Sequence, residues 1–204
     1  AIKDISDALA AVKAALVKSF KPLLVTGLGF TCTTEADSLL DFAERQNIPF
    51  ISTMHAKGWL PENHFNWIGV LGRARRTNVQ RFIKESDLII AVGYDPIEIN
   101  YEEWVGDIPV IHIATEKADV VGVQMLFNDA CDMDAAIREI AKLPLASNKW
   151  SMDAWVTHRA ELDAALRPPT QVLSAHRVLD ALREKLPSDG VLAYDVGTHT
   201  HQIA

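Results

Sequence analysis

The chain has 204 residues, of which 49% are hydrophobic and 23% charged, a composition typical of a globular protein with one or two domains. Its formal net charge of -7 argues against a surface that binds nucleic acid or an anionic membrane. No apolar run approaches the roughly 20 residues that span a bilayer. We therefore expect neither a nucleic-acid partner nor a membrane segment.

Helical and strand patterns alternate along the chain. In chain order they predict a helix over residues 5–16, a strand over 23–25, a helix over 36–43 capped by Thr34, a strand over 48–51, a long loop, a helix over 79–83, strands over 88–93, 110–113 and 123–127, and a helix over 133–140.

The strand segments are continuous apolar runs, which indicates burial on both faces of a parallel sheet. We predict an α/β fold: a doubly wound, mostly parallel six-stranded sheet with helices on both faces, of the Rossmann-like type that binds NAD or FAD. In such sheets ligands bind at the carboxyl ends of the strands, so the turns after Val25, Val92 and Ile113 are the candidate sites.

The pattern changes after residue 145. Residues 146–171 contain a polar, Pro-interrupted stretch that we interpret as an interdomain linker. Residues 172–204 read as a helix capped by Ser174 and then a buried strand from Gly190, which is how an α/β domain begins. We expect residues 1–145 to form a complete domain and residues 172–204 to be the start of an incomplete second α/β domain.

The ends and the cysteines give two more expectations. The sequence begins Ala1-Ile2-Lys3-Asp4, without Met or the pattern of a signal peptide, which fits a fragment boundary. Cys32 and Cys131 lack the spacing of a metal site, and two free thiols indicate a reducing, cytoplasmic setting.

Glycines follow the first predicted strand. Gly27 and Gly29 would let a backbone approach a diphosphate at the start of the next helix, but the third glycine of the dinucleotide fingerprint is missing. A tight turn with no ligand explains the two glycines equally well.

Two further turns are candidates for the same nucleotide. Gly72 and Arg73 open an arginine cluster that could hold phosphates, although pairing with the protein's own carboxylates is slightly favoured. Gly93 and Tyr94 follow the clearest strand, where a nucleotide would lie, and Pro96 equally indicates a rigid loop. The histidines show no metal-ligand spacing, so we assign no metal site.

The last residues form another candidate site. Val196, Gly197, Thr198 and His199 follow the final predicted strand, where backbone N–H groups and an imidazole would suit a diphosphate.

Several stretches follow one another in an order typical of one enzyme family: Lys57–His64, Glu85–Gly93, Gly93–Glu98 with Trp104, Val110–Ile113 with Ala114 in place of the usual Asp, Leu173–Leu186, and Asp195-Val196-Gly197. Through these stretches the chain resembles the thiamine-diphosphate-dependent enzymes of the acetolactate synthase group. The resemblance implies a central domain over residues 1–145, a linker over 146–171, and the start of the cofactor domain over 172–204.

The resemblance implies an enzyme that uses thiamine diphosphate and Mg²⁺ to act on a 2-keto acid, with decarboxylation and carboligation of pyruvate as the expected lyase or transferase activity. Val196, Gly197, Thr198 and His199 match positions that meet the diphosphate, although many members have Gln where Thr198 stands. The family's Mg²⁺ ligands and its cofactor-activating Glu match nothing in this chain. We therefore assign no catalytic residue, and expect the chain alone to be inactive and the full enzyme to be a homo-oligomer, a dimer or tetramer.

The central domain of this family binds FAD in some members, ADP in others and nothing in the rest. The segment Tyr94–Glu98 resembles members that work without flavin, and Arg75 and Arg76 stand where flavin-binding members have small residues. FAD is therefore not favoured here. Two alternatives remain: a non-enzymatic FAD- or ADP-binding module of the electron-transfer flavoprotein type, and a purely structural central domain that holds subunits together.

Overall fold

The computed structural model describes residues 5–72, 76–144, 149–187, 189–195 and 197. The chain divides into two compact units, Ala1–Trp155 and Val156–Ala204. The boundary between the units lies inside the segment predicted as a linker.

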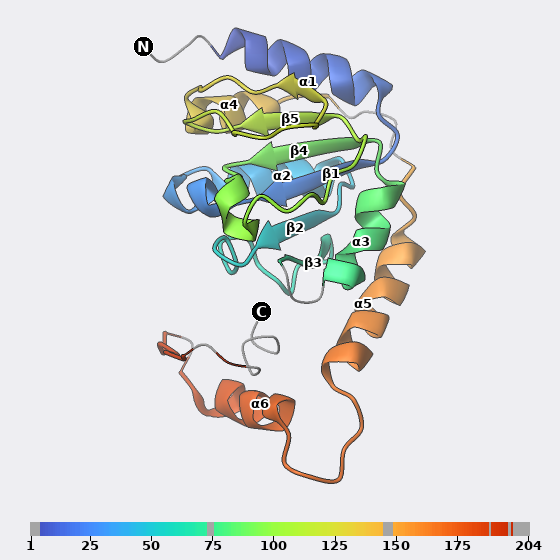
Figure 1. Cartoon of the computed structure of the whole chain (residues 1–204), viewed down its shortest axis with the longest axis vertical. Coiled ribbons are helices and arrows are strands. Elements are labelled where there is room, and N and C mark those ends of the chain that lie inside the picture. The colour runs from blue at the N-terminus through green and yellow to red at the C-terminus, as the bar shows by residue number, and fades with distance from the viewer. Residues whose placement is uncertain (1–4, 73–75, 145–148, 188, 196, 198–204) are drawn as a thin grey trace. The chain divides into compact units, whose positions relative to one another are not determined.

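Six strands, two short 3₁₀ turns and four helices make up the first unit within its described residues (Figure 1). In chain order they are α1 (Ser6–Lys18), β1 (Pro22–Thr26), η1 (Leu28–Cys32), α2 (Ala36–Arg45), β2 (Phe50–Thr53), β3 (Trp67–Leu71), α3 (Arg76–Glu85), β4 (Leu88–Val92), η2 (Pro96–Ile99), β5 (Val110–Ile113), β6 (Met125–Phe127) and α4 (Met133–Ile140).

The strands form one parallel sheet in the order β3-β2-β1-β4-β5-β6. The chain winds outward from β1 to β3, crosses back to β4, and winds outward again to β6. β1 is therefore the centre of the sheet, with Leu24 paired to Phe50 on one side and to Ile90 on the other. The predicted doubly wound fold is confirmed, and its switch point lies between β1 and β4.

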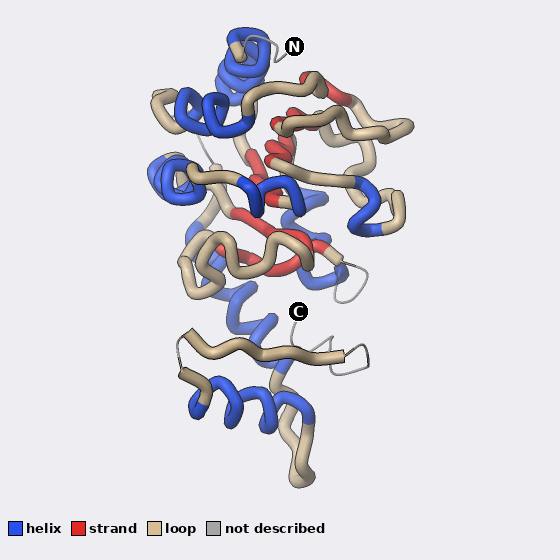
Figure 2. Tube along the Cα trace, turned by 90° about the vertical axis from the view of Figure 1, so that its left-hand side faces the viewer, coloured by secondary structure: helices blue, strands red, loops and turns tan. Residues whose placement is uncertain are grey.

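Successive strand residues point to opposite faces of the sheet, so the fully buried strands supply two cores. Leu24 and Ile90 face the core formed with α1, α2 and α4. Leu23 and Ile89 face the core formed with α3 and with Trp155, at the beginning of α5 (Met152–Leu166). Figure 2 shows the alternation of helix, strand and loop from the side.

Two details differ from the sequence prediction. β3 lies inside the segment predicted as a long loop; it contains Gly69 and is only partly buried, so its apolar signal is interrupted. α2 begins after Glu35 rather than Thr34, because the Thr34 hydroxyl donates instead to Asp134 of α4.

The second unit contains the rest of α5 and also α6 (Ala175–Lys185). Ser174 stands at the N-cap position of α6 as predicted, but its side chain makes no capping hydrogen bond. Arg167, just after α5, pairs with Asp180 of α6 at 3.2 Å. The predicted buried strand is wrong for residues 191–195, which are exposed and have no strand structure. A strand needs a partner for its backbone groups, and the described part of this unit offers none.

Candidate functional site

The turns after β1 and β4 meet at the carboxyl edge of the sheet, on the left of Figure 1, where the strand arrows point. Gly27 N donates to Val92 O at 3.0 Å, and Gly29 N donates to Gly93 O at 2.8 Å. Gly93 has a φ of +63°, and a Cβ there would lie 2.1 Å from Phe30 N. These glycines are therefore required by the contact between the two turns, whether or not a ligand binds.

A buried carboxylate, Glu98 of η2, lies directly against the first turn. Its side chain is 1% exposed. One oxygen accepts from Leu28 N at 2.8 Å and from Asp95 N at 3.2 Å. The other accepts from the Thr53 hydroxyl and lies 3.3 Å from His55 Nδ1. Glu98 thus joins the carboxyl ends of β1, β2 and β4.

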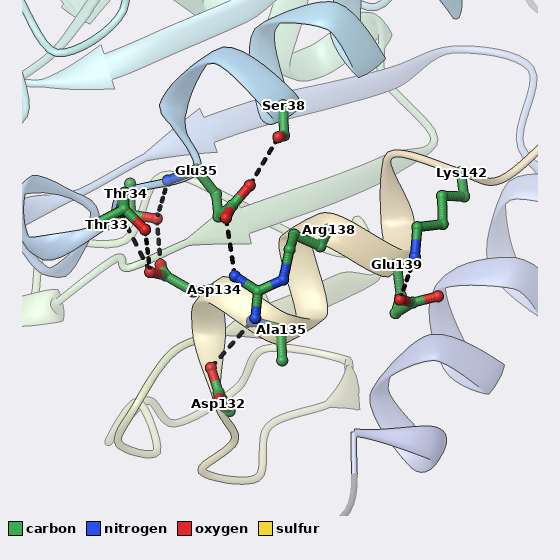
Figure 3. A network of polar contacts seen from close by, with 10 residues as sticks. All are labelled: Thr33, Thr34, Glu35, Ser38, Asp132, Asp134, Ala135, Arg138, Glu139 and Lys142. Atoms are coloured by element: carbon green, nitrogen blue, oxygen red, sulfur yellow. Dashed lines mark hydrogen bonds and ion pairs between the residues drawn. The ribbon is translucent and has the colours of Figure 1, made fainter.

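A second carboxylate, Asp134 of α4, contacts the segment between η1 and α2 (Figure 3). It accepts from the Thr33 hydroxyl, from the Thr34 hydroxyl at 2.8 Å, and from Thr34 N at 3.3 Å. Partial burial raises the pKa of Asp134, but the hydrogen bonds from Thr33 and Thr34 outweigh it, and the pKa lies below its usual value. The carboxylate is thereby held in its charged form beside the N-terminus of α2.

The neighbouring ion pair completes this network. Arg138 of α4 donates to Glu35 at 2.8 Å, and the Ser38 hydroxyl donates to the other oxygen of Glu35 at 2.7 Å. These two bonds hold the pKa of the Glu35 carboxyl below its usual value. Arg138, the cation drawn beside the α2 N-terminus in Figure 3, is thus already paired with a carboxylate of the chain.

A dinucleotide in a fold of this type places its diphosphate on the N–H groups of the turn after β1 and on the following helix N-terminus. Here Glu98 meets the N–H of Leu28, and Asp134 meets the N–H of Thr34. A diphosphate would have to displace one carboxylate or lie beside two negative charges. The residues present therefore do not fit the diphosphate of FAD or ADP at this turn.

Tyr94 leaves the carboxyl edge and packs on the face of the sheet. Its carbonyl lies 2.8 Å from Nε2 of His112, on β5, whose Nδ1 lies 3.0 Å from Asn128 Oδ1. Its hydroxyl accepts from Trp104 Nε1 at 3.0 Å. Burial lowers the pKa of His112, against the opposing effect of its two hydrogen bonds.

The structure thus brings four predicted nucleotide residues together: Gly27, Gly29, Gly93 and Tyr94. Gly72 is buried directly after β3. Gly197 belongs to the second unit, where it is half-buried. Arg73, Val196, Thr198 and His199 lie outside the described residues.

The two carboxylates were missed by sequence reasoning, for different reasons. Glu98 could have been found from its sequence neighbours, because Asp95 and Glu98 have the spacing of a capping box. In the structure both hydrogen bonds of this capping box form. Asp134 carried no such local signal, because it is about a hundred residues from the threonines it contacts.

The described residues hold neither a cluster suited to a metal ion nor a helix suited to a membrane. No cluster of three His, Cys, Asp or Glu side chains in that part of the chain is arranged to hold a metal ion. Within the same residues, no helix combines the length and apolar character needed to cross a membrane.

Residues 9–140, more than half of the chain, match the family model described as "Thiamine pyrophosphate enzyme, central domain". The chain belongs to the thiamine pyrophosphate enzyme family. The matched region covers the six-stranded sheet and all of α4, so the resemblance seen in the sequence is confirmed for the central domain. The match gives no support to the alternative of an electron-transfer flavoprotein module.

Similar proteins include acetolactate synthase large subunits. That of Corynebacterium glutamicum is 25% identical over 191 residues, which cover 88% of this chain and 30% of the relative. The putative thiamine pyrophosphate-containing protein YdaP of Bacillus subtilis is 26% identical over 191 residues, 90% of this chain and 32% of the relative. The chain therefore spans about a third of the length of these curated relatives.

Proposed function

We propose that the chain is part of a thiamine-diphosphate- and Mg²⁺-dependent enzyme that acts on 2-keto acids, with acetolactate-synthase-like decarboxylation and carboligation of pyruvate as its activity. The family match carries this proposal, and the similarity to acetolactate synthase large subunits supports the choice of reaction. When bound, thiamine diphosphate would supply the carbanion chemistry that loss of CO₂ from a 2-keto acid requires.

In this proposal residues 172–204 begin the domain that binds the diphosphate, and Val196, Gly197, Thr198 and His199 contact it. Mg²⁺ is required because the charge of a diphosphate must be compensated at close range. The further ligands and the catalytic groups belong to parts of the enzyme that this chain does not match, so the chain by itself is expected to be inactive. A dimer or tetramer in the cytoplasm is part of the same proposal.

We further propose that the central domain works without bound FAD. The observation that supports this is the pair of carboxylates, Glu98 and Asp134, on the N–H groups that a diphosphate would use. The central domain then serves as a scaffold whose glycine turns pack on each other.

The experiment is an assay of the full enzyme with pyruvate, thiamine diphosphate and Mg²⁺, in which both pyruvate loss and acetolactate formation are followed. Acetolactate formed without added flavin supports both parts of the proposal. Turnover only after addition of FAD would refute the flavin-free central domain. Pyruvate loss without acetolactate, or turnover of a different 2-keto acid only, would refute the assigned reaction.

A further inference from the structure

A cavity of about 290 Å³ lies over β4, β5 and β6, on the face of the sheet that also carries α3. Its floor is formed by Ala91, Val110, His112 and Met125. Ala91 is the register partner of His112, and Val110 that of Met125, so the four residues lie side by side on three adjacent strands. The floor of the cavity is therefore fixed by the sheet itself.

The order of the elements explains why space remains on this face. On the opposite face, α1 packs against β4, β5 and β6. On the cavity side, the segment from β4 to β5 forms only the short turn η2, and the segment from β5 to β6, which is also fully described, forms no helix. Loop residues within 94–105 and 118–123 line the cavity instead. An apolar sheet face must be covered by another element, and here loops cover it and leave a recess.

The polar groups at the floor and at one wall of the cavity are already used within the protein. The Tyr94 hydroxyl accepts from Trp104 Nε1 at 3.0 Å. The ring nitrogens of His112 lie 2.8 Å from Tyr94 O and 3.0 Å from Asn128 Oδ1. Asn128 in turn makes two hydrogen bonds of 2.9 Å with the backbone of Ala118. These groups have little hydrogen-bonding capacity left for a ligand, so its affinity must come from apolar contact.

The lining also gives a charged ligand little compensation. Among the described lining residues there is no lysine or arginine, and burial lowers the pKa of His112, so its imidazole is uncharged at neutral pH. Glu102 and Glu103 each have an interaction partner within the chain. Asp119 is exposed, where solvent screens its charge. An ion of either sign would lose its water here without gaining a partner, so the cavity favours an uncharged molecule.

An aromatic pair forms one wall. The rings of Tyr94 and Trp104 are 5.6 Å apart and meet edge to face at 70°. Their hydrogen bond fixes this arrangement, and a further aromatic ring packs favourably on such a pair. The other walls are mostly apolar, with Pro96, Val105, Val120, Val121 and Val123 among the lining side chains.

We propose that this cavity binds a small uncharged molecule with an aromatic ring, which packs on the Tyr94–Trp104 wall and above the floor of the sheet. The volume is at the lower end of the range for small-molecule sites, so the ligand has one ring or two fused rings. This inference is independent of the enzymatic activity proposed above.

The probes form a matched series: uncharged 2-phenylethanol, the cation 2-phenylethylamine, the anion phenylacetate, and 2-cyclohexylethanol, in which the ring is saturated. Each is titrated into the protein without added cofactor. The readouts are the NMR signals of the Trp104 indole N–H and the Met125 methyl group, assigned with the variants Trp104→Phe and Met125→Leu. We expect 2-phenylethanol to shift both signals saturably, with a Kd of about 1 mM. Each ion should bind several-fold more weakly, and 2-cyclohexylethanol about 2- to 10-fold more weakly.

Two variants and a control locate the site. Ala91→Leu fills the space above the floor and should abolish binding of 2-phenylethanol. Val120→Glu, at a half-buried lining position, brings a charge to the apolar wall and should weaken binding about 10-fold. The matched control Val17→Glu, at an exposed position of α1, should leave the affinity unchanged.

The proposal is overturned if 2-phenylethanol gives no saturable shift of either signal up to about 10 mM, or if any of the other three compounds binds as tightly as 2-phenylethanol does. It is also overturned if Val120→Glu binds 2-phenylethanol as well as Val17→Glu does. A nuclear Overhauser effect from the ring protons of 2-phenylethanol to the Met125 methyl group is expected in the original protein, so the location is decided even if Ala91→Leu does not fold. None of these measurements requires turnover, so failure of the assigned reaction does not affect them.

Discussion

Removal of the Glu98 carboxylate tests how the carboxyl edge of the sheet is held together. The variant Glu98→Ala deprives Leu28 N, Asp95 N and the Thr53 hydroxyl of their acceptor, in a site where the carboxylate is 1% exposed. A buried polar group that loses its partner costs about 1–3 kcal/mol. Leu28 is partly exposed, so water can accept from its N–H in the variant. We therefore expect Glu98→Ala to lower the free energy of unfolding by about 2–4 kcal/mol.

The variant Glu98→Gln separates the hydrogen bonds from the charge. The Gln carbonyl still accepts from Leu28 N, and the Thr53 hydroxyl rotates to accept from the new amide, so the loss should be only about 1 kcal/mol. The control Glu116→Ala, at an exposed position, should change the free energy of unfolding by less than about 0.5 kcal/mol.

The assay is urea unfolding, with the midpoint and slope fitted for each variant. The expected order of stability is original protein, then Glu98→Gln, then Glu98→Ala. The reasoning is refuted if Glu98→Ala is as stable as Glu116→Ala, or if Glu98→Gln is less stable than Glu98→Ala.

Three further predictions concern neighbouring positions. Gly93→Ala should destabilise by at least about 3 kcal/mol through its clash with backbone, whereas Gly106→Ala, with a similar positive φ but open space, should cost about 1 kcal/mol; thermal unfolding compares them. Burial lowers the pKa of His112 in the folded state, so the unfolded chain takes up a proton first and the free energy of unfolding should fall as pH drops below about 6.5. In urea unfolding between pH 7 and 5, the free energy of unfolding of His112→Asn should fall less steeply than that of the original protein. An equally steep fall for both proteins would contradict this. Because the pKa of Asp134 is lowered in the folded state, its carboxylate contributes stability that is present above the usual pKa near 3.8 and is lost as pH falls through the lower folded value. In an acid titration followed by circular dichroism, Asp134→Asn should lose less stability than the original protein. Equal losses of stability would count against this role of the carboxylate.

Most of the fold was predictable because fully buried parallel strands leave an unmistakable sequence pattern. Leu88–Val92 is apolar at every position, and the structure buries it on both faces. β3 lacks this pattern, since Gly69 interrupts a run that is only partly buried. Residues 191–195 show the reverse error: their pattern predicts a buried strand, but in the described structure no neighbouring strand pairs with them.

The candidate site was predictable only where its signals are local. Gly27, Gly29 and Gly93 mark the turns that meet at the switch point, because each turn belongs to one strand. The carboxylate of Asp134 reaches Thr33 and Thr34, in the segment before α2, only through the packing of α4 against α2. No spacing in the sequence predicts such a contact, so the sequence alone left a dinucleotide site open at this edge.

The most direct test of the account is a calorimetric titration of FAD into the protein, repeated with ADP. No binding heat is expected for either ligand at concentrations up to about 100 μM, because the carboxylates of Glu98 and Asp134 already accept from Leu28 N and Thr34 N. A Kd in the low micromolar range for either ligand, accompanied by release of the Glu98 contacts, would contradict it.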